Sequence, residues 1–176
     1  MFSRSHQERL SRLARNLEKL AEKDRERIRA DEEFLALRQA AAAELHQILT
    51  AFVAEVNALV TGVKLDLSPV VWPAGSLNQN EVNVFQINVS GRVIQFNFQV
   101  TDNLRERMEI RAEYTLAGAI RWFNQELLER EEVREDRLYY CVGRSVHGWR
   151  YVDSRSQKMG VFDADYLAGL LEQLVG

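Results

Sequence analysis

Residues 85–100 read FQINVSGRVIQFNFQV, and this stretch decides the fold. Apolar residues alternate with amides on both sides of Ser90-Gly91, which is the pattern of two half-buried β-strands joined by a tight turn. Such a hairpin has one apolar face and one amide-rich face. The sequence therefore predicts an antiparallel sheet that is covered by other elements on its apolar face.

Other stretches around this hairpin show strand patterns, some clear and some weak. The further strands are predicted over residues 63–67, 108–116, 119–123, 138–142 and 149–152. Pro69 and Pro73 follow the first of these and confine it to a sheet edge. A short charged helix is predicted from Asn124 to Glu131. The sheet should thus hold about five or six antiparallel strands within residues 63–153.

A long helix is expected before the sheet, because the first glycine is Gly62 and the first proline is Pro69. Asp31 is suited to cap a helix that starts with two glutamates, so a continuous helix and one bent near Ala30 both fit the sequence. From Phe34 onward the apolar face widens, as expected for a helix that packs on a sheet.

A second helix is expected at the other end, over residues 163–175. Asp163 is a good N-cap, and leucines at helical spacing follow it. We expect this helix on the same face of the sheet as the long one. The predicted class is α+β, with a helical arm at residues 1–30 and one domain at residues 31–176.

Composition excludes several classes of protein. Of 176 residues, 46% are hydrophobic and 28% charged, with a net charge of −3, which argues against disorder and fibrous repeats. No apolar run is long enough to span a membrane or to form a signal-peptide core. The single cysteine, Cys141, agrees with a reducing compartment, so we expect a cytoplasmic protein.

Motifs for chemistry are mostly missing. The one cysteine and three dispersed histidines do not have the spacing of a metal site, and no phosphate-binding loop is present, so no metal or cofactor is expected. The best catalytic candidates are Cys141 as thiolate, His147 as base and Asp153 as its orienting acid. A cysteine in an apolar strand is more often a core residue. The balance favours a protein that is not an enzyme and leaves an enzyme open.

The amide-rich face of the hairpin is a candidate surface for a ligand or an extended peptide. Its residues are Gln86, Asn88, Gln95, Asn97 and Gln99. These side chains offer hydrogen-bond donors and acceptors without charge. A polar strand face is more often simply solvated.

The arm carries the pattern to which we give most weight. Leucines recur there at spacings of three and four, as in the seam of a coiled coil. The four residues are Leu10, Leu13, Leu17 and Leu20. The next positions of the repeat are Asp24 and Arg27, which end the seam. Exposed leucines at this spacing need a cover, which a second copy, a different protein, a membrane surface or the body of the same chain can supply. Of these we expect the arm to pair with a second copy in a homodimer.

The sequence thus predicts a binding protein that self-associates through its first helix and binds an unidentified protein partner. The alternative is a small-molecule sensor or an enzyme, with a pocket between the sheet and its helices. A weaker alternative is nucleic-acid binding, because aromatic and basic residues mix in the last third of the chain. The sequence pI of about 5.7 opposes that reading.

Overall fold

A computed structural model describes residues 4–101, 110–124, 126, 129–130 and 133–176. Within them the chain forms one long helix, seven strands and a final helix, which confirms the predicted α+β class. The chain divides into two compact units, residues 1–37 and residues 38–176.

The first helix, α1, runs from Arg4 to Leu59 without interruption. The helix continues through Ala30 and Asp31 does not begin a second helix, so of the two forms that fit the sequence the structure has the continuous one. No glycine or proline occurs before Gly62, and neither Asp31 nor its neighbours remove a backbone donor. The backbone hydrogen bonds of the helix therefore continue past Ala30.

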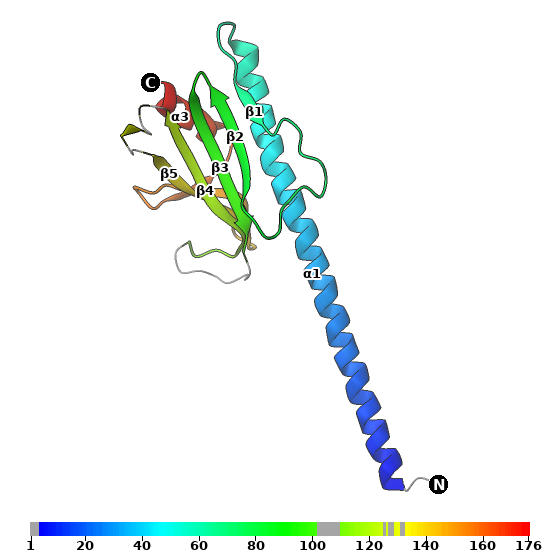
Figure 1. Ribbon diagram of the computed structural model, residues 1–176. Helices are drawn as coiled ribbons and strands as arrows, with labels where there is room; N and C mark the ends of the chain where they lie inside the picture. Colours follow the sequence, from blue (N-terminus) through cyan, green and yellow to red (C-terminus); the bar gives the residue numbers. More distant parts are fainter. Residues whose placement is uncertain (1–3, 102–109, 125, 127–128, 131–132) are drawn as a thin grey trace. The chain divides into compact units, whose positions relative to one another are not determined.

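Seven strands form one antiparallel sheet, in which each strand pairs with its neighbours in the chain (Figure 1). The strands are β1 Asp66–Ser68, β2 Asn83–Val89, β3 Arg92–Val100, β4 Tyr114–Asn124, β5 Arg134–Val142, β6 His147–Val152 and β7 Met159–Val161. The sheet is thus one strand larger than the upper limit of the prediction. The additional strand, β7, has only three residues, too few to show an alternating pattern.

The predicted strand at residues 108–116 was largely wrong in position. Its residues 108–109 lie outside the described part of the chain, and β4 begins only at Tyr114 and continues to Asn124. Asn124 ends a strand instead of capping a helix. Half of the predicted helix over 124–131 lies outside the described residues, although the Arg130 N–H donates to the Glu126 carbonyl as in a helical turn.

The β2–β3 hairpin has the predicted turn and register. Ser90 and Gly91 both have positive φ, 47° and 78°, as a two-residue type I′ turn requires. Phe85 lies opposite Phe96, and Gln86 lies opposite Gln95. Side chains alternate along each strand, so the phenylalanines face one side of the sheet and the glutamines face the other.

Both helices cover the apolar side of the sheet within residues 38–176 (Figure 1). From α1, Ala41, Ala42, Leu45, Leu49 and Phe52 are buried. The Trp149 indole N–H, on β6, donates to the Ala41 carbonyl at 2.8 Å and joins sheet to helix. Burial of aromatic and aliphatic side chains at this interface is the main term that stabilises the fold.

The final helix, α3, runs from Ala164 to Val175 on the same side. Asp163 caps it as predicted, since its side chain accepts from the Tyr166 N–H at 3.0 Å. Leu167, Leu170 and Leu174 are buried against the sheet. We call the opposite side of the sheet, which no described helix covers, the open face.

Candidate binding groove on the open face

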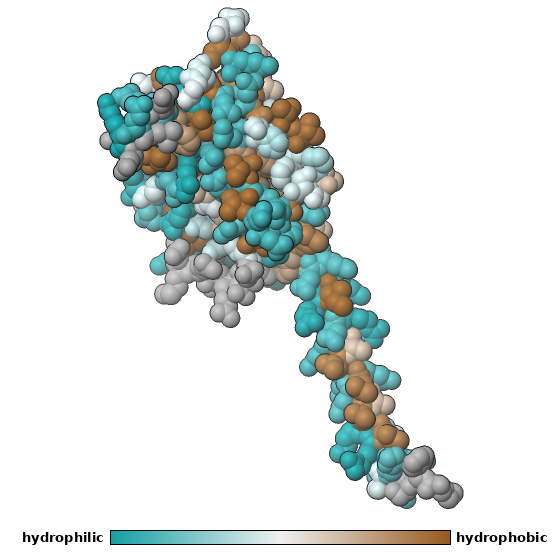
Figure 2. Space-filling model, in the orientation of Figure 1, coloured by the Kyte–Doolittle hydropathy of each residue, from teal (hydrophilic) through white to brown (hydrophobic). Residues whose placement is uncertain are grey.

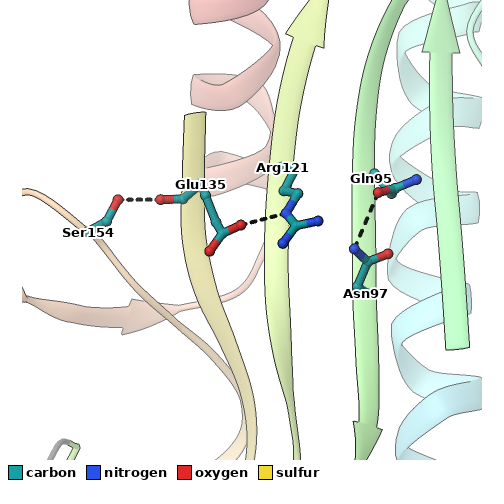
Figure 3. Close-up of polar contacts among 5 residues, drawn as sticks. All are labelled: Gln95, Asn97, Arg121, Glu135 and Ser154. Atoms are coloured by element: carbon teal, nitrogen blue, oxygen red, sulfur yellow. Dashed lines mark hydrogen bonds and ion pairs between the residues drawn. The ribbon is translucent and has the colours of Figure 1, made fainter. Parts of the chain in front are cut away.

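The amides of β2 and β3 meet on the open face and bond to one another. Gln86 donates to Asn88 at 2.7 Å, Gln95 donates to Gln86 at 3.4 Å, and Asn97 donates to Gln95 at 3.3 Å. Figure 3 shows the last of these contacts. Gln99, the fifth predicted residue, is exposed farther along β3. The structure therefore brings four of the five candidate amides into one chain of hydrogen bonds.

Beside Asn97 and Gln99, β4 contributes only alanine side chains to the open face. Ala119 lies opposite Asn97 and Ala117 lies opposite Gln99, so the sheet surface is low along this strand. The result is a groove of about 270 Å³. Its lining consists of Val82, Asn97, Phe98, Gln99, Ala117, Gly118, Ala119 and Arg121.

The wall of the groove holds an unused hydrogen-bond acceptor. The Asn97 Oδ1 atom is buried and has no partner among the described residues. A buried acceptor without a partner costs about 1–3 kcal/mol.

An ion pair bounds the groove near Arg121. The register places Gln95, Arg121 and Glu135 side by side on three neighbouring strands. Arg121 Nε lies 2.5 Å from Glu135 Oε2, and the Ser154 hydroxyl donates to the Glu135 carbonyl (Figure 3). Because the two charges compensate each other, this end of the groove is polar but close to neutral.

A small apolar cluster occupies another part of the open face. Tyr114, Tyr139, Cys141, Val152 and Ala112 are all buried there. The rings of Tyr114 and Tyr139 have centroids 4.8 Å apart. This cluster explains why β5 is buried on both faces around Cys141, and it gives the cysteine a structural role.

The three catalytic candidates do not come together. Cys141 pairs with Gly148 and points to the open face, whereas His147 lies on the helix side with its ring against Tyr140. Asp153 lies six residues after His147, about 20 Å away along an extended strand. The Asp153 carboxylate accepts the backbone N–H groups of Arg155 and Ser156 in the turn after β6.

The ionisation of these groups agrees with structural roles. Burial raises the pKa of the Cys141 thiol to about 11, so the thiol is neutral near pH 7. The backbone hydrogen bond from Ser156 lowers the pKa of Asp153. No group of three or more possible metal ligands exists in the described part of the chain.

A larger cleft of about 820 Å³ lies between α3, the strands β4 to β6 and the turn after β6. Inside it the buried Asp136 carboxylate accepts the Tyr166 hydroxyl at 2.8 Å and the Ser154 N–H at 3.0 Å. Burial, followed by the Asp136 charge, raises the pKa of Tyr166. Trp122 also lines the cleft, and its indole N–H has no partner among the described residues.

The leucine seam of α1 is exposed along its length. The exposed fractions are 49% for Leu10, 53% for Leu13, 56% for Leu17 and 55% for Leu20. Figure 2 shows apolar side chains at intervals along this part of the helix, between polar ones. The seam is an apolar stripe without a partner among the described residues of this chain.

Comparison with protein-family models, curated proteins and solved structures finds no match for this chain. Among the described helices, none combines the length and the apolar character that crossing a membrane requires. The groove, the cleft and the seam are the features of this chain that bear on its function.

Sequence reasoning missed the β4 and β5 side of the groove. The floor residues Ala117 and Ala119 carry no chemical signal of their own, and Arg121 and Glu135 are fourteen residues apart in the sequence. Their relation to the amides depends on a strand register that local alternation does not show. The run Ala117-Gly118-Ala119 of very small residues was the one available sign of a low sheet surface.

Proposed function

We propose that this protein is a non-enzymatic binding module. It pairs with a second copy through the leucine seam of α1, and it binds a segment of a partner protein in the groove on the open face. The observation that carries the proposal is the seam, in which four leucines at coiled-coil spacing are each about half exposed on a long continuous helix.

The energetics of the seam support a weak dimer. Burying the exposed half of a leucine stabilises by about 1 kcal/mol, so eight leucines in two copies contribute about 8 kcal/mol. Since association costs at least about 4 kcal/mol, the net stabilisation is about 4 kcal/mol or less, and a dissociation constant of about 1 mM or weaker is expected. The helix is already formed in a single chain, which keeps the ordering cost low.

The chemistry of the groove supports an uncharged peptide segment as the ligand. Amides on one wall match the N–H and C=O groups of a main chain, and the alanine floor leaves room for small side chains. The exposed Val82 and Val84 stand beside the amides on β2 and offer apolar contacts. Arg121 and Glu135 compensate each other, which gives no preference for a charged ligand.

Selection from a library of displayed peptides tests the groove. The wild-type chain should enrich peptides whose binding is lost in Ala119→Trp, because the indole fills the groove without touching the core. The exposed Lys158→Ala is the matched control and should bind as the wild type does. If no peptide is enriched, or if Ala119→Trp binds all enriched peptides unchanged, the groove is not the binding site.

A second candidate function is a small-molecule sensor, and the cleft beside α3 favours it. The volume of about 820 Å³ suits a small ligand, and no described residue supplies an acceptor to the buried Trp122 indole N–H. Native mass spectrometry of gently purified protein would show a discrete added mass that is lost in Trp122→Phe. A spectrum with only the chain mass opposes this candidate.

We also propose a cytoplasmic location. The buried, unpaired thiol of Cys141 supports a reducing compartment, because it forms no disulfide. Fractionation of cells that express the tagged full chain tests this assignment, and recovery from the membrane or secreted fraction contradicts it.

A further inference from the structure

We infer that the two copies pair in parallel and in register, so that each leucine of the seam lies beside the same leucine of the second copy. This inference rests on the proposed dimer and adds its orientation. It follows from the residues that flank the seam on α1.

The flanks of the seam differ in charge. In heptad notation Leu10 and Leu17 occupy a, and Leu13 and Leu20 occupy d. Over residues 7–23, the g positions on one flank then hold Arg9, Asn16 and Lys23, and the e positions on the other flank hold Gln7, Ala14 and Ala21. One flank is therefore basic and polar, and the other is uncharged and mostly small.

An antiparallel pair that keeps all four leucines in contact brings the two g flanks together. Leu10 would lie beside Leu20 of the second copy, and Arg9 would lie beside Lys23 of the second copy at both ends. Two repulsive contacts between like charges oppose this arrangement. No described acid on the g flank compensates them, since Asn16 is the remaining g residue.

A parallel pair avoids this repulsion. Each g residue then lies across from an e residue of the next heptad, so that Arg9 meets Ala14 and Asn16 meets Ala21 of the second copy. The long stems of Arg9 and Lys23 can cover the apolar seam while their charges stay in water. Beyond Leu20 the next a position is Asp24, which would face Asp24 of the second copy. Repulsion between these two carboxylates ends the paired segment.

Parallel pairing has a consequence for binding. In both copies the chain continues from the same end of the paired helices into residues 38–176. Both grooves are thus joined through the chain to the same end of the paired helices. A partner that carries two copies of the bound segment would then bind the dimer more tightly than a single groove allows.

Disulfide trapping in the full chain distinguishes the orientations. Leu10 and Leu20 are separated by about 15 Å along the helix, whereas a disulfide needs Cα atoms within about 7 Å. In a parallel pair, Leu10→Cys alone and Leu20→Cys alone each form a linked dimer on mild oxidation. In an antiparallel pair neither does so alone, and only co-expressed Leu10→Cys and Leu20→Cys chains link to each other.

Two controls complete the experiment. Ser11→Cys lies on the outer face and should not link, and the wild type should not link because Cys141 is buried. Lys23→Glu should change the dimer dissociation constant by less than twofold at low salt in a parallel pair, but should tighten an antiparallel pair several-fold.

The outcomes separate the orientation from the dimer itself. Linkage of the single variants supports the inference. A dimer by sedimentation that links only as a mixed pair overturns the orientation and leaves the proposed function intact. A wild-type chain that stays at 20.4 kDa at all concentrations overturns both.

Discussion

Replacing the two central leucines of the seam, Leu13→Asp with Leu17→Asp, should dissociate the dimer and leave the sheet folded. Both side chains are more than half exposed, at 53% and 56%, so the single chain loses little when they are changed. Each dimer loses four half-buried leucine contacts of about 1 kcal/mol, or about 4 kcal/mol in total. This corresponds to a dissociation constant about a thousandfold weaker, before any repulsion between the new carboxylates.

The assay is sedimentation over a concentration series from about 50 µM to about 5 mM, the range around a dissociation constant of about 1 mM. The wild type should pass from 20.4 kDa to twice that mass, and the double variant should stay at 20.4 kDa. Ser5→Asp with Ser11→Asp adds the same charge outside the seam and should dimerise as the wild type does. An identical concentration dependence for both double variants would refute the seam as the interface.

Three further predictions concern the body of the protein. Gly118→Ala should lower the free energy of unfolding in urea by more than about 2 kcal/mol, because its Cβ would lie 1.8 Å from the Asn97 carbonyl oxygen, whereas Gly169→Ala in α3 meets nothing within 4 Å and should lose no stability. Asp136→Asn should cost about 1–3 kcal/mol by the same measurement, since the carboxylate accepts hydrogen bonds from Tyr166 and Ser154; an unchanged midpoint would contradict the role of this network. The pKa of the Cys141 thiol is about 11 in the folded chain and about 9 in the unfolded chain. The free energy of unfolding should therefore keep its full value below pH 9 and fall as the pH rises toward 11. A thiol reagent should label Cys141 only when the chain unfolds.

Local patterns in the sequence were enough to predict the hairpin and the helices. The Ser90-Gly91 turn joins two strands of strict alternation, so its register follows from the turn alone. Asp163 and the leucines after it define α3 in the same way. In these elements the spacing of the apolar residues and the turn or capping residue indicate the same secondary structure, and tertiary packing does not change it.

The elements that are harder to predict are those in which apolar and polar residues do not alternate regularly. β4 contains Ala117-Gly118-Ala119, in which small residues on both faces conceal the alternation. β7 has three residues and exists because β6 offers it an unpaired edge. For the candidate site, the amides were predictable from β2 and β3. The groove was not, because it requires the pairing of β3 with β4 and of β4 with β5.

The order of the strands bears on how the chain folds during its synthesis. Every strand pairs with a neighbour in sequence, so the sheet can form one hairpin at a time as the chain leaves the ribosome. α1 is made first, but the Trp149 side chain that bonds to Ala41 follows 108 residues later. At about 5–20 residues per second, the apolar side of α1 waits several seconds or more for the end of the sheet. During that interval the apolar side of α1 is exposed to water.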